Sequence, residues 1–424
     1  MLQPTIRLLG LATLIAASIF SQAQAQTILT GQTKGGAYYT IAVPDPWNGD
    51  LVIWNHGYSF SPVSANPDLG PLAVLQLLEG YAVAASSYQQ SQWAVFRTRK
   101  DIERLVDKFE DLVDEPNNII LTGASLGGIV TADALERADI DNVVGAFAFC
   151  GAMAGSRTWD GAHDLRLTYD AICGGIPEAA IPGGATGLPA GVPGISLDMV
   201  AGAVNACTGL LQPPGTQTPQ QLVNLQKLLN STQLPPNFII QDMFFATNGI
   251  SNLIFAPDKL NGGQGLGNIG VKYSDPDINA VIQRVQADRK AAKKLKKNFT
   301  PKGDLENDDV KIVSIHTDKD GLVIVENEKE YQDVIDADNL TVAVAVEAIP
   351  SHCGFQPAEL VAGWEALRGW VAGLPQPNAQ DLQLTCQGIE AVGLFPGPCR
   401  FDPSFVIADM DGRIPARDNT KKPK

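Results

Sequence analysis

The sequence is poor in histidine and in positive charge. It contains four histidines among 424 residues, and its formal net charge at pH 7 is −15. An acidic surplus argues against a nucleic-acid partner, because proteins that bind nucleic acid neutralise phosphates with a basic surface. The scarcity of histidine also narrows the search for catalytic groups. Chemistry that needs an imidazole must use one of His56, His163, His316 and His352.

Long apolar segments are scarce as well, except at the N-terminus. There Arg7 precedes an apolar run from Leu8 to Phe20, and Ala23-Gln24-Ala25 offers small residues for cleavage. This pattern predicts a signal peptide over residues 1–25, cleaved after Ala25. No cysteine stands at the cleavage position, and no later segment is apolar enough to cross a bilayer. We therefore expect an exported protein, secreted or periplasmic, without an integral membrane segment once the signal is removed.

The spacing of the six cysteines is unlike that of a zinc site. An even number of cysteines in an exported chain instead suggests disulfides. Proximity along the chain favours Cys386–Cys399 and Cys173–Cys207, which leaves Cys150 with Cys353. We expect neither a metal nor a cofactor.

Apolar strand patterns alternate with helix patterns over residues 26–150 and again over residues 306–375. Buried strands that alternate with amphipathic helices predict an α/β fold, with a doubly wound, mostly parallel sheet and helices on both faces. The expected strands are 27–30, 37–43, 51–55, 81–86, 118–122, 143–149, 310–315 and 341–348. The expected helices of this core are 69–78, 93–113, 128–135, 323–334 and 357–371.

The alternation stops between these two parts. Residues 151–305 are most simply a lid or cap insertion, with helices expected at 222–229 and 277–299. The stretch 284–297 is strongly basic; it is either a solvated helix face or a patch that attracts anionic substrates or a membrane surface. Residues 376–424 are expected to form a disulfide-stapled C-terminal extension that ends in a mobile basic tail from Arg417.

The most informative motif is Gly123-Ala124-Ser125-Leu126-Gly127. It lies between an apolar strand and a helix, which is the pattern of a nucleophile elbow. The chain turns so sharply there that the serine hydroxyl is exposed, and side chains at positions 123 and 127 would crowd the turn. The helix N-terminus beneath supplies N–H groups and positive potential where an oxyanion would form.

A serine nucleophile needs a base and an acid that orients the base. In this kind of sheet the acid and the histidine follow the serine in that order, at the ends of later strands. His316 and His352 both come late enough, but only His352 is preceded by a strand-end acid. The acid is Asp318 or Asp320; Asp320 is favoured because it leads into Gly321 and the next helix.

Together these motifs resemble the α/β-hydrolase family over residues 51–150 and 310–373. The resemblance rests on His56-Gly57, the Gly123–Gly127 elbow, the stretch from His316 to Asp320 and the His352 loop. It implies that Ser125 is the nucleophile, His352 the general base and then acid, and Asp320 the orienting acid. It further implies oxyanion donors from the N–H groups of Leu126 and Tyr58, and a structural role for His56 in holding that loop.

The tannase and feruloyl-esterase group of this family carries a disulfide between cysteines beside the serine and the histidine. Here Cys353 follows His352 but Ala124 precedes Ser125. Cys150, at the end of the neighbouring strand, could reach Cys353 instead and brace the histidine loop.

The leading functional hypothesis is an exported serine hydrolase that cleaves carboxylic esters of small-molecule or polymer-derived substrates. The alternatives are a serine (amino)peptidase of the same fold and a catalytically idle protein that uses the fold for binding. The peptidase would grip a substrate amine with carboxylates of the insertion, for which Glu178, Asp198 and Asp242 are candidates.

Overall fold

The computed structural model describes residues 26–189 and 191–417, so the predicted signal peptide lies outside the described residues. The chain divides into two compact units. The first contains the chain up to Met153 together with Pro301–Ile407. The second contains Ala154–Thr300 and the chain from Ala408 onward. The region after residue 375 is therefore shared between the two units.

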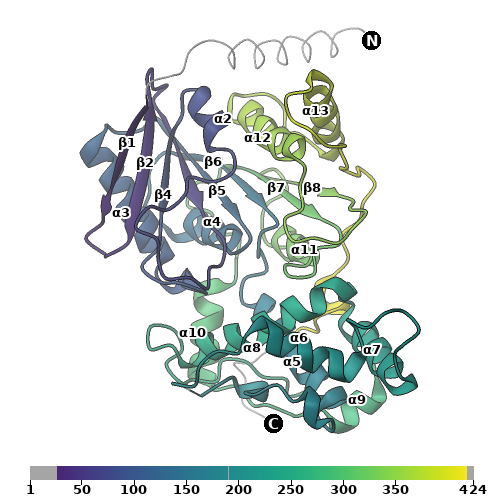
Figure 1. The fold of residues 1–424 in the computed structure, drawn as a ribbon. Coiled ribbons are helices and arrows are strands. Elements are labelled where there is room, and N and C mark those ends of the chain that lie inside the picture. Colours follow the sequence, from purple (N-terminus) through teal and green to yellow (C-terminus); the bar gives the residue numbers. More distant parts are fainter. Residues whose placement is uncertain (1–25, 190, 418–424) are drawn as a thin grey trace. The chain divides into compact units, whose positions relative to one another are not determined.

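The first unit is built on an eight-stranded sheet with the strand order β1-β2-β4-β3-β5-β6-β7-β8 (Figure 1). All pairings from β4 to β8 are parallel, and β2 alone runs against its neighbours. This is the mostly parallel α/β sheet expected from the sequence. The strands are β1 Gln26–Gln32, β2 Tyr38–Pro44, β3 Asp50–Asn55, β4 Ala82–Ser86, β5 Asn118–Ala124, β6 Val143–Phe149, β7 Lys311–Thr317 and β8 Leu340–Ala345.

Helices cover both faces of this sheet, as the strand pattern predicts. On one face, Val313 and Ile315 of β7 share an apolar cluster with Trp364 of α12. On the other face, the alternate residues Ser314 and His316 contact α11. The helices of the unit are α2 Ala73–Leu78, α3 Thr98–Leu112, α4 Leu126–Arg137, α11 Glu326–Gln332, α12 Pro357–Val371 and α13 Ala379–Val392.

Helix α13 lies in the region that the sequence analysis treats only as an extension. Asn378 caps it by accepting hydrogen bonds from the N–H groups of Gln380 and Asp381. Its inner face buries Leu382 and Cys386 against the same apolar cluster as α12. The abundance of proline and glycine around the helix obscures this short amphipathic pattern in the sequence.

The second unit is helical in its described part. Its helices are α5 Arg157–Cys173, α6 Leu197–Thr208, α7 Pro219–Thr232, α8 Ile239–Phe255, α9 Pro276–Val281 and α10 Arg289–Phe299. The prediction of a single helix over residues 277–299 is wrong, because a non-helical segment separates α9 from α10. Asp288 begins α10 by accepting hydrogen bonds from the N–H groups of Lys290 and Ala291.

The basic stretch forms an amphipathic face on α10. Leu295 and Phe299 are buried, whereas Lys293, Lys296 and Lys297 are exposed. This arrangement fits a solvated helix face.

The prediction of a mobile tail that begins at Arg417 is wrong for Arg417 itself. Arg417 lies within the second unit, and its side chain is only 3% exposed. Its guanidinium donates two hydrogen bonds to the Asp164 carboxylate, of 2.9 and 3.0 Å, and lies 3.0 Å from Asp160. A buried, bidentate ion pair holds the backbone at this position. No helix among the described residues is long and apolar enough to span a membrane.

Candidate active site

Ser125 stands alone between β5 and α4, in a backbone conformation that most residues avoid. Its φ is +55° and its ψ is −122°. Glycines two residues away on each side make this turn sterically allowed, since a Cβ atom at Gly127 would lie 1.9 Å from the carbonyl oxygen of Asn55. A Cβ atom at Gly123 would lie 2.3 Å from the carbonyl oxygen of Gly127. The strained turn and the two glycines are the features expected of a nucleophile elbow.

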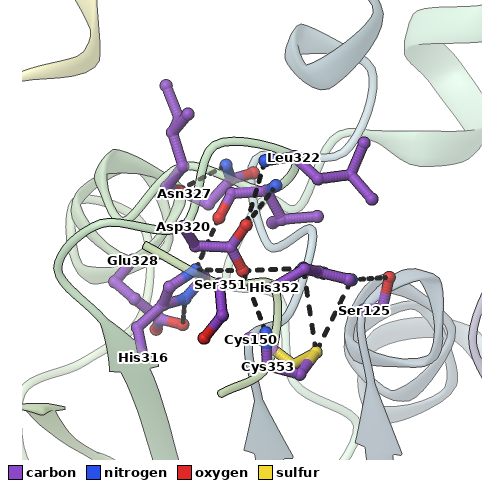
Figure 2. A network of polar contacts seen from close by, with 12 residues as sticks. Ser125, Cys150, His316, Asp320, Leu322, Asn327, Glu328, Ser351, His352 and Cys353 are labelled. Atoms are coloured by element: carbon purple, nitrogen blue, oxygen red, sulfur yellow. Dashed lines mark hydrogen bonds and ion pairs between the residues drawn. A yellow bond between two sulfur atoms is a disulfide. The ribbon is translucent and has the colours of Figure 1, made fainter. Parts of the chain in front are cut away.

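The three side chains singled out from the sequence form one chain of hydrogen bonds (Figure 2). The Oγ of Ser125 lies 2.9 Å from Nε2 of His352, and Nδ1 of His352 lies 2.7 Å from Oδ2 of Asp320. Asp320 is buried, and its Oδ1 accepts hydrogen bonds of 3.0 Å from the N–H groups of Leu322 and Val323. A carboxylate only accepts, so Nδ1 carries a proton and Nε2 is left to accept from Ser125.

Asp318 and His163, which the sequence also offered as candidates, do not contact Ser125 or His352. Asp318 accepts a 2.7 Å hydrogen bond from the N–H of Glu347, which ties the end of β7 to the chain after β8. His163 is buried in the second unit, where Nε2 meets the carbonyl oxygen of Ala185. The geometry therefore selects Asp320 over Asp318 as the partner of His352.

His316 forms a second layer behind Asp320. Its Nδ1 lies 2.9 Å from a carboxylate oxygen of Glu328, and its Nε2 lies 2.7 Å from the carbonyl oxygen of Val323. The carbonyl oxygen only accepts, and so does the Glu328 carboxylate when it is ionised, so this pairing favours a proton on each ring nitrogen. Burial by itself lowers the pKa of His316, but the hydrogen bond and charge of Glu328, with the charge of Asp320, outweigh burial and raise that pKa.

The Nε2 atom of His316 lies 4.0 Å from Oδ2 of Asp320. Glu328 thus indirectly supports Asp320, although the sequence analysis did not single it out. Three glutamates alternate along α11, at positions 326, 328 and 330, and nothing in their spacing distinguishes the one that turns inward.

The loop that carries His352 is fastened on both sides of the ring. On one side, the Glu347 carboxylate accepts hydrogen bonds from the hydroxyl and the N–H of Ser351. On the other side, Cys353 is joined to Cys150 at the end of β6. All three disulfides predicted from the sequence are present, the others being Cys173–Cys207 and Cys386–Cys399.

The proposed oxyanion donors lie on the two segments that flank Ser125. Leu126 is the first residue of α4, where N–H groups have no acceptor within the helix. Tyr58 follows Gly57 on the loop after β3, and a Cβ atom at Gly57 would lie 3.3 Å from the Cβ of Ser125. Tyr88 supports this loop, because its hydroxyl donates to the carbonyl oxygen of His56 and its ring stacks on the His56 ring.

A cavity of about 410 Å³ opens between this loop and the chain after β4. Its lining is rich in hydroxyl and amide groups and includes His56, Gly57, Tyr58, Ser59, Ser91 and Gln92. The phenol of Tyr58 donates to the amide oxygen of Gln92, and the Gln92 N–H donates to the carbonyl oxygen of Ser59. These bonds tie the loop after β3 to the chain after β4 on the two sides of the cavity.

A carboxylate, an imidazole nitrogen and a sulfur, from Asp320, His352 and Cys353, lie within 4.8 Å of one another, as the ligands of a metal would. The sulfur of Cys353 is in a disulfide and cannot act as a thiolate ligand. The carboxylate and the imidazole are already hydrogen-bonded to each other. The donor set therefore fits a hydrogen-bonded relay better than a metal centre.

The buried pair of Glu328 and His316 generates a prediction about stability and pH. Because the pKa of His316 is raised in the folded state, its stabilising contribution is complete below the unfolded-state pKa and is lost as pH rises through the folded-state pKa. We expect Glu328→Gln to lower the free energy of unfolding by about 3 kcal/mol near neutral pH. We also expect it to move the alkaline loss of stability to lower pH.

Urea denaturation over a pH series measures both effects. Asp333→Asn, which removes an exposed carboxylate just after α11, is the matched control. An alkaline loss of stability that stays at the same pH in Glu328→Gln would contradict the assignment of a buried imidazolium.

No protein-family model matches the sequence, and no curated protein matches it. Solved structures with a similar chain path include feruloyl esterase B from Aspergillus oryzae, with 12% identity, a TM-score of 0.43 and coverage of 84% of this chain and 82% of the esterase. Lipase A from Candida antarctica in its closed state has 13% identity, a TM-score of 0.41 and coverage of 88% and 89%. Acylaminoacyl peptidase from Pyrococcus horikoshii has 10% identity and a TM-score of 0.40; the match covers 80% of this chain but only 39% of the peptidase.

Proposed function

We propose that this protein is a serine hydrolase that cleaves carboxylic esters through an acyl-enzyme on Ser125. The observation that carries the proposal is the continuous hydrogen-bonded chain from Asp320 through His352 to Ser125. A buried acid, an imidazole held in one tautomer and a serine on a strained turn are the parts that nucleophilic acyl transfer requires.

The chemistry follows from the positions of the protons. Ser125 Oγ attacks the ester carbonyl carbon while its proton passes to Nε2 of His352, and the carbonyl electron pair moves onto oxygen. The intermediate collapses, the bond to the alcohol oxygen breaks, and Nε2 returns the proton to the departing alcohol. Water then repeats the sequence on the acyl-enzyme and releases the acid. Asp320 stabilises the imidazolium that forms in each half-reaction.

The N–H groups of Leu126 and Tyr58 are proposed to stabilise the oxyanion. The Leu126 N–H lies at the N-terminus of α4, where the helix dipole also favours negative charge. Burial keeps the Tyr58 phenol neutral by raising its pKa, so its side chain brings no charge into the oxyanion loop. Fixed donors of this kind need no rearrangement as charge develops.

We also propose that the protein works after export. Its three disulfides are of the kind that persist in oxidising compartments. One of them joins Cys353, next to the proposed base, to Cys150. An oxidising compartment would therefore restrain the loop that carries His352.

The decisive experiment compares an aryl ester with an aminoacyl anilide on the mature protein and labels the protein with a fluorophosphonate probe. Ester turnover with labelling of Ser125 supports the proposal. Faster turnover of the anilide would favour the peptidase alternative. Absence of both turnover and labelling would leave the idle binding fold as the better description.

The first prediction from the proposed function concerns the nucleophile. Ser125→Ala should lower kcat for ester hydrolysis by about 10⁴-fold or more, because only the oxyanion donors and substrate binding then remain. Circular dichroism and thermal unfolding check that the fold is retained. Near-normal turnover by a folded variant would refute the assignment.

The second prediction separates the two candidate acids. Asp320→Asn should lower kcat by about 10⁴-fold, because the amide stabilises the wrong imidazole tautomer of His352. Asp318→Asn is the matched control, since it changes the same functional group two residues away. Equal losses in the two variants, or a larger loss in Asp318→Asn, would show that Asp320 has been misassigned.

The third prediction concerns the disulfide beside the base. The double variant Cys150→Ser/Cys353→Ser should lower kcat by about 100-fold, because a shift of about 1 Å in a catalytic base is enough to cause such a loss. Cys173→Ser/Cys207→Ser removes a disulfide from the second unit and serves as the control. Kinetics are measured at a temperature at which both variants are folded. A similar fall in kcat in both double variants would contradict a local effect on the His352 loop.

A further inference from the structure

A short C-terminal segment, residues 397–402, runs alongside the loop that carries His352. Its backbone bonds to the end of β8: the N–H of Val346 donates to the carbonyl oxygen of Arg400, and the N–H of Asp402 donates to the carbonyl oxygen of Val344, both over 2.9 Å. Phe401 forms an antiparallel bridge with Ala345. The segment therefore extends the sheet at its edge, just where the chain leaves β8 for the His352 loop.

The side chain of Arg400 contacts the His352 loop directly. Its Nη2 donates a 2.7 Å hydrogen bond to the carbonyl oxygen of Gly354, two residues after His352. The same guanidinium binds both carboxylate oxygens of Glu359 on α12, through Nε over 2.9 Å and through Nη2 over 2.7 Å. Arg400 thus joins the His352 loop to the first turn of a buried helix.

The contact is buried and closely fitted. The Glu359 side chain is fully buried and that of Arg400 is 17% exposed. Glu359 also accepts a hydrogen bond from the N–H of Gln356, so its orientation is fixed by the helix cap. At Gly397, where φ is +126°, a Cβ atom would lie 2.5 Å from the Gln356 side chain. Because these side chains are closely packed and hydrogen-bonded, moving them would cost free energy.

The loop also needs this support. Gly354 packs so closely that a Cβ atom there would lie 1.7 Å from the Ser351 hydroxyl. Glu347 holds Ser351 and the disulfide holds Cys353, but neither contact restrains the carbonyl of Gly354. Arg400 provides the restraint on the side of the loop that leads into α12.

We propose that Arg400 is a positioning residue for the base: it sets the place of His352 through Gly354, and residues 397–402 are thereby part of the catalytic apparatus. The expected effect on kcat rests on the ester hydrolase function proposed above, whereas the expected effect on the position of His352 does not. The placement of the His352 ring can be tested without turnover. Cys399, which immediately precedes Arg400, is anchored to α13 by its disulfide with Cys386, so the segment is itself held.

The test compares Arg400→Met with Arg368→Met. Arg368 is the matched control because it also forms an ion pair with a buried carboxylate of α12, that of Glu365, at 2.9 Å. It bonds to neither His352 nor the His352 loop. Both variants should lose stability, since each leaves a buried carboxylate without its partner. Only Arg400→Met should lower kcat for an aryl ester, by about 10- to 100-fold with little change in KM.

Two further variants separate positioning from a loss of stability. Arg400→Met/Glu359→Gln removes the unpaired carboxylate and should regain stability without regaining kcat. Arg400→Ala should recover part of its kcat when millimolar guanidinium is added, whereas Arg368→Ala should not respond. Full recovery of kcat in the double variant, or no difference between Arg400→Met and Arg368→Met, would overturn the proposal.

A measurement that does not depend on activity is the NMR signal of the Nδ1 proton of His352, which is shifted downfield by its hydrogen bond to Asp320. With four histidines in the chain, this signal can be assigned from Asp320→Asn. We expect it to broaden or vanish in Arg400→Met and to persist in Arg368→Met. If the wild type shows the signal but neither hydrolyses esters nor reacts with a fluorophosphonate, the proposed function fails and this comparison still decides the role of Arg400. Persistence of the signal in Arg400→Met would overturn the proposal that Arg400 positions His352.

Discussion

The hydrogen bond between Nδ1 of His352 and Asp320 determines what the rest of the site can do. It fixes which ring nitrogen carries the proton, and so decides whether Ser125 meets an acceptor or a donor. The bond joins the end of β7 to the loop after β8, so it depends on the parallel pairing of these two strands. The alternation of buried strands and covering helices therefore has a direct chemical consequence: it places the Asp320 carboxylate and the His352 imidazole, on the loops after two adjacent strands, 2.7 Å apart.

The site is surrounded by buried charges that occur in matched groups. Behind Asp320, the His316 ring lies between two carboxylates, whose charges help to raise its pKa. Beyond the His352 loop, Glu359 is matched by Arg400. An unpaired buried charge is costly, whereas a well-bonded group fixes geometry, so these pairs make the arrangement of the loop sensitive to the loss of a single partner. Under the proposed function, the same side chains would contribute to both stability and catalysis.

The sequence predicted the parts of the site that obey local rules. The elbow at Ser125 is visible because sterics demand glycine at 123 and 127, and His352 and Asp320 are found because parallel strands bring their ends together. The sequence could not predict Glu328 or Arg400, since their roles depend on tertiary contacts over separations of 12 and 46 residues. Helix α13 and the break between α9 and α10 were missed because a short cap residue, Asn378 or Asp288, decides each boundary against the surrounding pattern.

The cysteines connect the chemistry of the site with the compartment expected from the sequence. Cys353 is the direct neighbour of His352, and Cys399 is the direct neighbour of Arg400, so two of the three disulfides end beside the His352 loop or beside a residue that contacts it. In a reducing environment the loop would keep its hydrogen bonds to Glu347 but lose the covalent restraint at Cys353. If His352 is the base of the proposed ester hydrolysis, a small displacement of its ring would have a large effect on rate, and we expect full activity only after oxidation. Formation of the disulfides would then complete the catalytic site as well as stabilise the fold.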